Sequence, residues 1–591
     1  MLKINQIKLP LTADEHDLRR AAGKALRLDE NRIRTLRVTK KAVDSRKKDN
    51  IFFVYNVEVD VDGDENAILR RCGSGVEAVK EVSFTPPEIK RTSELRPVIV
   101  GFGPAGMFSG LALARAGFKP LILERGAHIE DRQKDVQVFW HERRLNTESN
   151  VQFGEGGAGT FSDGKLTTGI KDPLCRFVID ELANHGAPEE IRWSAKPHIG
   201  TDRLAEVVRN IRKEIVSLGG EIRFNCKMAD IIVANGYIHG VKTEQNGHFE
   251  DIETDTVLLC TGHSARDTVR TLYARGVKMM QKPFSVGARI EHPREFIDRA
   301  QYGDFAGHPA LGAADYKLAC HPEHGRGAYT FCMCPGGTVV NAASEEGGIV
   351  VNGMSEYGRD AENSNSALLV GIEPENFGSD HPLAGMDMQR KIEHAAFLAG
   401  GSDYTAPAQL VGDFLADRPS TRLGAVHPSC PTGVVMGDLR KILPKKVTDT
   451  YADALLKMDR MLRGFAMPEA VFTAPETRSS SPVRILRDEI YQSNIRGLYP
   501  CGEGAGYAGG IVSAGVDGVR CAYAVLADDI SERIGHMRQG VELRPARKLY
   551  QLIKISVEQV GYIPLRIIKI HKILLVLKIV HRAYDHIIGQ V

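Results

Sequence analysis

The stretch Arg96–Gly126, RPVIVGFGPAGMFSGLALARAGFKPLILERG, decides the fold. It begins with a short apolar run, residues 97–100, of the kind that is buried in a parallel sheet. The glycines that follow stand at the start of a predicted helix in the pattern GxGxxG: Gly101, Gly103 and Gly106. In this pattern the first glycine permits a tight turn, the second lets the backbone approach a pyrophosphate, and the third lets the helix pack on the strand. Because a helix N-terminus also attracts negative charge, the stretch predicts a dinucleotide site.

The acidic residue Glu124 ends a second apolar run, residues 120–123, and it lies about 20 residues beyond the glycine turn, as in dinucleotide-binding folds. A carboxylate at this place is expected to accept hydrogen bonds from both ribose hydroxyls, and it would repel a 2′-phosphate. We therefore expect the adenosine half of NAD or FAD here. Three neighbouring residues complete this half of the predicted site: Pro104, Ala105 and Arg125.

The segment 497–522, GLYPCGEGAGYAGGIVSAGVDGVRCA, is a second strand and glycine turn that leads into a helix of small residues. It resembles the C-terminal flavin motif of the glutathione-reductase-like FAD enzymes. The resemblance implies that an acid holds the ribityl chain, here Glu503 after Gly502, where that family usually has Gly-Asp. It also implies that backbone N–H groups at Gly510 and Ile511 face the flavin pyrimidine, where negative charge develops on reduction. The alternative is a packing helix whose small residues only permit close approach.

Two further segments are expected at the cofactor. A predicted strand over 255–260 ends in a turn of three residues: Thr261, Gly262 and His263. The segment 153–168, FGEGGAGTFSDGKLTT, carries five glycines among polar residues, so its backbone donors can wrap around phosphates or a flavin edge. The residues predicted to contact the cofactor in it are Gly156, Gly157, Gly159, Thr160, Ser162, Gly164 and Lys165.

Three runs together are similar to a family of uncharacterised bacterial and plastid FAD-dependent dehydrogenases, also described as NAD(FAD)-utilising dehydrogenases. These runs are GGAGTFSDGKL at 156–166, TGHSARD at 261–267 and ETRSSSPVRI at 476–485. The resemblance covers about residues 1–535. It implies FAD as the cofactor and the domain architecture, and it leaves the substrate open.

The order of the predicted elements gives an α/β fold in several parts. We expect a doubly wound, Rossmann-type FAD-binding domain with an inserted substrate domain of mixed or antiparallel sheet and an N-terminal ferredoxin-like α+β domain. The predicted boundaries are 1–92 for the ferredoxin-like domain, 93–270 and 486–538 for the two segments of the FAD domain, 271–485 for the inserted domain and 539–591 for a basic amphipathic tail. The first domain has the order βαββαβ, with its last strand expected over 79–84. We expect the active site at the interface between the inserted and FAD domains.

The composition is that of an ordinary globular protein, with 42% hydrophobic and 26% charged residues among 591. A net charge of +2 argues against a dedicated nucleic-acid binder, although a basic turn at 40–48 allows an anion site for NADPH phosphates or RNA. The simpler interpretation of that turn is a solvated hairpin that also docks on the FAD domain. No apolar run is long enough to cross a membrane and the N-terminus lacks a secretory pattern, so a cytoplasmic location is expected. The ten cysteines show no zinc spacing, so no metal site is expected.

Candidates for catalysis lie in the inserted domain and in the loop that follows it. Cys332 and Cys334, in TFCMCPGG, share one face of a predicted strand because side chains alternate with period two. They could form a redox pair, supply a thiolate, or face the core as small apolar side chains. Arg478 stands in a polar loop and could clamp a carboxylate substrate or stabilise the reduced flavin. Arg289 and His263 are comparable candidates, and for each single residue a structural salt bridge or turn contact is an equal alternative.

The expected function is that of a FAD-dependent oxidoreductase that passes a hydride or electrons between flavin N5 and a small-molecule substrate. NAD(P)H is a candidate reductant, and it would bind transiently at the flavin because no second GxGxxG follows a strand. One alternative is a flavoprotein accessory in RNA modification or binding, through the basic turn. Another is a membrane-surface quinone or isoprenoid reductase, or a partner contact, through the basic amphipathic segment 541–591.

Overall fold

The computed structural model describes residues 1–80, 86–323 and 326–528. The tail predicted over 539–591, the end of the second FAD segment and most of the strand predicted over 79–84 lie outside the described residues. Within the described ranges, no helix is both long enough and apolar enough to cross a membrane.

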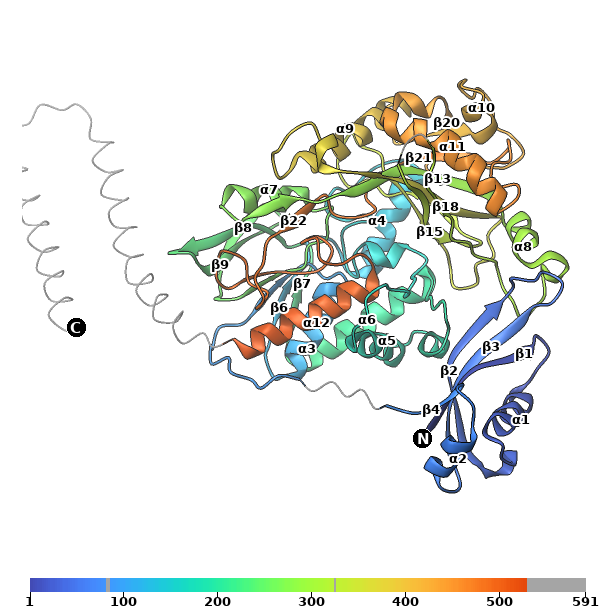
Figure 1. The fold of residues 1–591 in the computed structure, drawn as a ribbon. Helices are drawn as coiled ribbons and strands as arrows, with labels where there is room; N and C mark the ends of the chain where they lie inside the picture. Colours follow the sequence, from blue (N-terminus) through green and yellow to red (C-terminus); the bar gives the residue numbers. More distant parts are fainter. Residues whose placement is uncertain (81–85, 324–325, 529–591) are drawn as a thin grey trace, which may run out of the picture. The chain divides into compact units, whose positions relative to one another are not determined.

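The N-terminal part folds as an antiparallel four-stranded sheet with two helices (Figure 1). Its elements are β1 Leu2–Pro10, α1 Glu15–Leu26, β2 Ile33–Asp44, β3 Phe52–Val61, α2 Glu65–Arg71 and β4 Val76–Ala78. The strand order β2-β3-β1-β4 is that of a ferredoxin-like sandwich. Residues of β3 alternate strictly between buried and half-buried positions, so the sheet has one face for a core and one face for solvent.

The last strand of this sheet differs from the one predicted over 79–84. The strand is β4, which pairs with the start of β1 so that Ala78 faces Leu2. Next to this pair, the Met1 carbonyl accepts from the backbone N–H of Val79.

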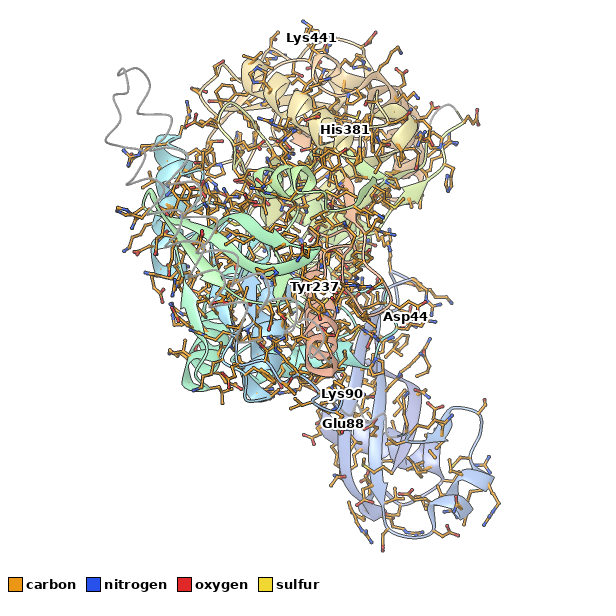
Figure 2. All side chains as sticks on the ribbon, turned by 90° about the vertical axis from the view of Figure 1, so that its left-hand side faces the viewer. Asp44, Glu88, Lys90, Tyr237, His381 and Lys441 are labelled. Carbon is orange, nitrogen blue, oxygen red and sulfur yellow. The ribbon has the colours of Figure 1, made fainter. Side chains whose placement is uncertain are left out.

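The basic turn at 40–48 is partly neutralised by its own neighbours. The carboxylate of Asp44, labelled in Figure 2, accepts from Arg46 Nε and Nη2 at 2.7 Å each. The backbone of Lys41 bonds to residues 193–195, with its N–H 2.7 Å from the Trp193 carbonyl oxygen. These contacts fit a hairpin that docks on the neighbouring domain better than a free anion site.

The second sheet is the parallel sheet that the glycine motif predicts. Its order is β23-β11-β5-β6-β7, and every neighbouring pair is parallel. Its strands are β5 Val98–Val100, β6 Leu121–Leu123, β7 Glu221–Arg223, β11 Val257–Leu259 and β23 Leu498–Pro500. All but β7 are buried along their length, which explains their uninterrupted apolar sequences. The chain order reverses at β5, and in such sheets a ligand binds beyond the carboxyl ends of the strands at the point of reversal.

Small residues in the C-terminal helix of this domain serve close packing. The helices of the domain are α3 Pro104–Arg115, α4 Ile129–Glu142, α5 Leu174–Asn184, α6 Thr201–Ser217, α7 Arg266–Ala274 and α12 Ile511–Ala527. Helix α12 lies against α3 (Figure 1). A Cβ on Gly518 of α12 would collide with the backbone of Ala105 in α3, and one on Gly515 would lie 2.8 Å from the Phe108 ring. One face of α12 therefore requires glycine for contact with α3. A three-stranded antiparallel sheet also belongs to this part of the chain: β8 Lys227–Ala234, β9 Tyr237–Gln245 and β10 His248–Glu253.

The region between the two parallel-sheet segments contains a seven-stranded sheet, in the order β14-β15-β18-β13-β21-β19-β20. Its strands are β13 Phe284–Pro293, β14 Ala319–Cys320, β15 Ala328–Cys334, β18 Asn363–Ile372, β19 Ala406–Leu410, β20 Val434–Met436 and β21 Val471–Glu476. The pairs are antiparallel except for β19 with β20, as predicted for a mixed sheet. Four helices accompany it: α8 Arg294–Tyr302, α9 Ala384–Ala399, α10 Val411–Leu415 and α11 Lys445–Met461.

Two short strand pairs accompany the seven-stranded sheet. β12 Met279–Gln281 pairs with β22 Val483–Ile485, so the chain enters and leaves the region at one place. β16 Thr338–Asn341 pairs with β17 Val351–Met354 beside the larger sheet. The domain boundaries given above stay predictions, whereas the sheets themselves are observed.

Candidate functional site

Gly101 and Gly106 have the backbone environment that the dinucleotide motif requires. Gly101 has a φ of +98°, and a Cβ there would lie 2.5 Å from the carbonyl oxygen of Cys260 and 3.1 Å from the Thr261 Cα. A Cβ on Gly106 would collide with the carbonyl oxygen of Gly101. Only glycine avoids both conflicts, so the tight turn after β5 and the close packing of α3 follow from these two residues.

Two helices begin at this edge of the sheet without a side-chain cap. Helix α3 follows Gly103 and α12 follows Gly510. Both capping residues are glycines, which have no side chain to bond the first N–H groups of the helix. The first four N–H groups of a helix have no partner within the helix, and they carry the positive end of its dipole, so they can bind an anion. A Cβ on Gly510 or Gly509 would meet no protein atom within 4 Å, so open space adjoins the start of α12.

The glycine loop, which we define as residues 154–165, lies across both helix starts. A Cβ on Gly157 would lie 2.9 Å from the Gly103 Cα, and one on Gly159 would lie 3.2 Å from Ile511 Cγ1. The loop thereby joins the N-terminus of α3 to the N-terminus of α12, which come from opposite ends of the FAD-domain sequence. The structure brings together three segments that sequence analysis identified separately.

The turns after β5, β11 and β23 also meet one another. A Cβ on Gly502 would lie 2.8 Å from the Ala105 Cβ. The Nδ1 atom of His263 lies 3.3 Å from Glu503 Oε1, and a Cβ on Gly262 would meet no protein atom within 4 Å. The turns that carry predicted cofactor residues therefore meet at the carboxyl ends of three adjacent strands, with open space beside Gly262.

The Glu124 carboxylate is held mainly by backbone N–H groups. Its Oε2 accepts from Phe102 at 2.8 Å, and its Oε1 accepts from Gly126 and Gly154 at 2.9 Å each. A carboxylate offers about four lone-pair sites, so one remains for a ribose hydroxyl. The carboxylate also closes the glycine turn, and its contact with the ribose hydroxyls stays a prediction.

Arg125 has several partners within the protein. Its guanidinium bonds to Glu148 and to Asp267 at 2.9 Å each, and it lies 4.1 Å from the centre of the Phe153 ring. These contacts tie the end of β6 to the glycine loop and to α7. A direct contact between Arg125 and the cofactor stays a prediction.

Polar side chains of the glycine loop shape the loop itself. Ser162 Oγ donates to the Gly159 carbonyl at 2.6 Å and accepts from the Gly164 N–H at 3.0 Å. Thr160 is buried and bonds to backbone within the loop, and Lys165 is half-buried. We therefore expect the backbone of this loop, more than its hydroxyl groups, to contact the cofactor.

The two candidate cysteines lie at a β-bulge, not on a regular strand. Phe331 and Cys334 of β15 pair with Ala367 and Asn365 of β18, which leaves two residues of β15 opposite one of β18. Cys332 lies in the bulge with a φ of +42°. The alternation that the prediction assumed is therefore interrupted. Instead, the Cys334 side chain folds back so that its Sγ lies 3.3 Å from the Cys332 carbonyl oxygen.

A buried ion pair adjoins the cysteines. The Arg289 guanidinium on β13 binds the Glu476 carboxylate on β21, with Nη2 donating to Oε1 at 3.2 Å and Nε donating to the other oxygen. Arg289 Nη1 donates to the Cys332 carbonyl at 2.8 Å and lies 3.9 Å from Cys334 Sγ. Burial raises the pKa of Glu476 to about 7, while the guanidinium opposes this rise. Sequence reasoning named Arg289, but nothing near position 476 indicated its partner.

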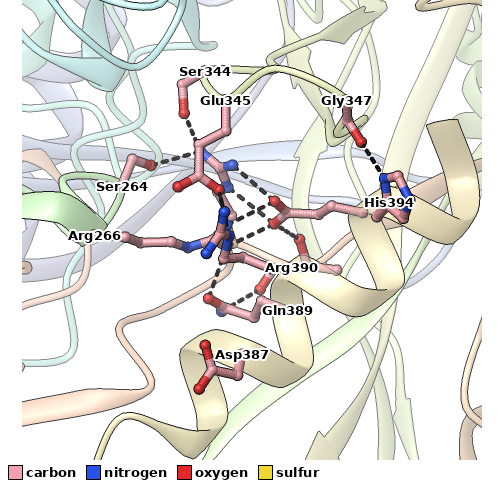
Figure 3. Close-up of polar contacts among 12 residues, drawn as sticks. Ser264, Arg266, Ser344, Glu345, Gly347, Asp387, Gln389, Arg390 and His394 are labelled. Atoms are coloured by element: carbon pink, nitrogen blue, oxygen red, sulfur yellow. Dashed lines mark hydrogen bonds and ion pairs between the residues drawn. The ribbon is translucent and has the colours of Figure 1, made fainter. Parts of the chain in front are cut away.

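Arg478 belongs to a second buried cluster, in which one carboxylate binds two guanidinium groups (Figure 3). Glu393 of α9 accepts from Arg478 Nε at 3.1 Å and Nη2 at 2.9 Å, and from Arg266 Nη1 and Nη2 at 2.8 Å each. Arg478 Nη1 also donates to the hydroxyls of Ser264 and Ser344. The Arg478 side chain is 4% exposed, so the carboxylate that it clamps is Glu393 of this chain. The suggested clamp on a substrate carboxylate is corrected accordingly.

Among the described residues, one group places metal-ligand atoms close together. Cys501, Asp517 and Cys521 offer such atoms within 4.8 Å of one another. The Asp517 carboxylate, however, binds Arg487 Nη2 and the Gly502 N–H at 2.7 Å each. These partners satisfy the buried charge, and the cluster serves to orient the turn after β23.

The fold and the site together define a Rossmann-type flavoprotein, in which a parallel sheet and two helix N-termini form a dinucleotide site beside a larger mixed sheet. Residues 283–479 match the family described as FAD-dependent protein, C-terminal domain-like, and residues 1–60 match a domain of unknown function. An uncharacterised protein of Clostridium beijerinckii is 46% identical over 529 residues, which cover 89% of this chain and 98% of that protein. The chain belongs to the family of this Clostridium protein, and its match to FAD-dependent proteins supports FAD as the cofactor.

Solved structures show more distant similarities. A geranylgeranyl bacteriochlorophyll reductase-like protein of Thermoplasma acidophilum is 12% identical with a TM-score of 0.36, over 76% of this chain and 83% of that chain. A flavoprotein/dehydrogenase of Cytophaga hutchinsonii is 12% identical with a TM-score of 0.32, over the same shares of the two chains. Similarities this distant carry no functional conclusion. The proposed function rests on the family match and on the geometry of the site.

Proposed function

We propose that the protein is a FAD-dependent oxidoreductase whose cofactor lies along the glycine loop, between the starts of α3 and α12. One observation carries this proposal. Two uncapped helix N-termini, from opposite ends of the FAD-domain sequence, meet at the same glycine-rich backbone. The start of α3 supplies donors for a pyrophosphate. The start of α12 supplies donors for a second negatively charged part of the same ligand.

Each part of the cofactor has its own support. The start of α3 suits the pyrophosphate, and Glu124 retains one acceptor site for the ribose. The start of α12, with open space beside Gly509 and Gly510, suits the flavin pyrimidine, whose negative charge on reduction the helix dipole stabilises. When bound, FAD supplies the hydride and electron chemistry, so the main task of the side chains is to place the substrate.

The substrate in this proposal is a small molecule that approaches from the seven-stranded sheet. Asp163 of the glycine loop binds Arg359, which lies between β17 and β18, with Nε at 2.9 Å. The loop that serves the cofactor is thus fastened to the sheet region. NAD(P)H is proposed as a transient reductant at the same face. In the described chain, the five-stranded sheet is the one all-parallel sheet of that size, so a separate nicotinamide domain of the same kind is not seen there.

Anaerobic reduction of the FAD-loaded protein tests this function. The protein is mixed with NADH or with NADPH, and the flavin absorbance near about 450 nm is followed, with free FAD at the same concentration as the control. We expect one nicotinamide to bleach bound FAD at least tenfold faster than free FAD. The chemically reduced protein is then mixed with quinones, enones and disulfides to find its acceptor. Bound FAD that reacts no faster than free FAD with every donor and acceptor contradicts the proposal.

A further inference from the structure

We propose that Cys332 and Cys334 form a redox-active dithiol that closes to an intrachain disulfide and exchanges two electrons with FAD. The inference rests on the proposed function for its electron partner, whereas the closing of the disulfide can be tested without it. Among the ten cysteines, all of which lie in the described chain, these two stand together at a bulge of the seven-stranded sheet.

The bulge removes the geometric obstacle to such a disulfide. On a flat strand, residues i and i+2 place their Cα atoms about 6.5 to 7 Å apart, near the upper limit for an unstrained bridge. Cys332 instead has a left-handed φ of +42°, and the strand bends at this point. The Cys334 thiol is turned toward Cys332, because its Sγ donates to the Cys332 carbonyl oxygen at 3.3 Å.

The two thiols differ in exposure in the way that a redox pair requires. Cys332 is half-buried and its neighbour Phe331 is 41% exposed, so Cys332 is the cysteine of the pair that lies nearer the surface. Cys334 is fully buried beneath it. In thiol–disulfide exchange, one accessible thiolate attacks and a second, protected thiol then closes the bridge.

Positive charge surrounds the outer thiol. The neighbouring Cys334 thiol, with the charges of Lys165 and Arg289, lowers the pKa of Cys332, although burial opposes this. By contrast, burial raises the pKa of Cys430, in the same region of the chain, to about 11. Arg289 acts here as a positioning residue, since its Nη1 holds the Cys332 carbonyl at 2.8 Å.

The glycine loop connects this pair to the cofactor site. Lys165, whose charge acts on Cys332, ends the loop that lies across the starts of α3 and α12. The loop is also fixed from the cysteine side, because the carbonyl of Gly336, two residues beyond Cys334, accepts from the Ala361 N–H beside Arg359, the partner of Asp163. Two residues of the loop, Lys165 and Asp163, therefore link the surroundings of the dithiol to the backbone at the predicted flavin.

The proposed step balances without a further reagent. Closing the pair breaks two S–H bonds and forms one S–S bond, and the two electrons and two protons released reduce oxidised FAD to its dihydro form. The reverse reaction reopens the disulfide and regenerates oxidised FAD. A substrate disulfide or another two-electron acceptor would then exchange with Cys332 from the solvent side.

Peptide mass spectrometry of the full-length, FAD-loaded protein tests the disulfide directly. Trypsin releases residues 327–359 as one peptide whose cysteines are Cys332 and Cys334 alone. After oxidation with diamide and alkylation with iodoacetamide under denaturing conditions, we expect this peptide to be two hydrogens lighter and free of alkyl groups. After reduction with dithiothreitol, it should carry two alkyl groups. A peptide that carries two alkyl groups after both treatments overturns the inference.

Anaerobic reductive titration tests the exchange with FAD. The diamide-oxidised wild-type protein should take up twice as many electrons per FAD as Cys334→Ser, and the Cys320→Ser variant, altered on the neighbouring strand β14, should match the wild type. Equal uptake by all three proteins overturns the exchange even if the disulfide forms. A protein that closes the disulfide but binds no FAD instead contradicts the proposed function, so the two failures are distinct.

Discussion

His263 Nδ1 lies 3.3 Å from Glu503 Oε1, so an imidazole on the turn after β11 contacts the acid on the turn after β23. These strands are neighbours in the parallel sheet, and the two turns stand beside the open space at Gly262. The resemblance of the C-terminal segment to flavin motifs assigns this acid to the ribityl chain. The contact with His263 therefore holds Glu503 in place, and Glu503 is the side chain that is expected to bind the ribityl chain of the cofactor.

Replacing Glu503 by Gln removes the charge and keeps the size. Because the Glu503 carboxylate is partly exposed, the loss of its bond to the ribityl chain should weaken FAD binding by about 1 kcal/mol, or roughly fivefold in Kd. Fluorescence titration of the FAD-free protein with FAD measures the change. Glu489→Gln, at an exposed position before β23, serves as the control and should leave Kd unchanged. Equal affinity in Glu503→Gln and the wild type would remove Glu503 from the site.

A carboxylate at the start of α12 should oppose the flavin directly. Gly509 is exposed, and a side chain there would enter open space, so Gly509→Asp should fold normally. The added negative charge would occupy the helix N-terminus and repel the charge of the reduced flavin. We expect FAD affinity to fall at least about tenfold, equal to 1.4 kcal/mol, with no loss in the melting temperature of the FAD-free protein.

The control for that change is Gly73→Asp, also at an exposed glycine with no atom near its Cβ. It adds the same charge to the N-terminal domain. If both variants weaken FAD binding equally, net charge and not the α12 N-terminus is responsible.

Glu393 is expected to be a large contributor to stability. Burial raises its pKa, but the charges of Arg266 and Arg478 outweigh burial and hold the pKa well below its usual range. Glu393→Gln leaves Arg478 without a carboxylate partner and Arg266 with Glu345 alone, in a buried site, which costs about 3–5 kcal/mol. Asp387→Asn on the same helix breaks an exposed pair with Arg270 and should cost at most about 1 kcal/mol. Thermal unfolding of the FAD-free variants compares the two.

The same cluster predicts an acid dependence. A carboxyl whose pKa is depressed by folding stabilises the protein at neutral pH, and this contribution is lost as pH falls below about 4, the ordinary range for Glu. The difference in melting temperature between wild type and Glu393→Gln should therefore be largest near neutral pH and shrink in acid. A difference that stays constant down to acid pH would show that lost packing, not lost charge, causes the destabilisation.

Cys332 should react as a thiolate at neutral pH. Because its pKa is lowered, the rate of its alkylation by iodoacetamide should stop rising at a lower pH than the rate of an ordinary thiol. An ordinary thiol would instead react faster as pH rises through about 8.5. Cys334→Ala removes the largest cause of the shift, so the midpoint should move upward. Peptide 327–359 reports the site, and a midpoint near the ordinary value in the wild type would contradict the assignment.

Local patterns predicted the elements that depend on neighbouring residues. The glycines of GxGxxG, the apolar strands β5, β6, β11 and β23, and the small residues of α12 each reflect a short-range steric demand. The strand order of the N-terminal domain also followed from its βαββαβ order. In these cases the sequence contains both the residue and the reason for it.

Pairings across the fold were beyond a single sequence. Glu393 lies in an ordinary helical pattern, and nothing near it indicates that Arg266 and Arg478 converge there. The bulge at Cys332 likewise depends on the register between β15 and β18, which two separate strands set together. The competing demands on Glu124, from three backbone N–H groups, became visible only when the loops were placed.

The measurement that tests the account most directly is the identity and amount of cofactor in the purified full-length protein. Its visible spectrum is recorded, and the cofactor released by heat is identified by chromatography and counted against the protein chain. The account predicts one FAD per chain with absorbance near about 450 nm, retained in Gly73→Asp and diminished in Gly509→Asp. A folded protein that is colourless and takes up no FAD from an excess would contradict it.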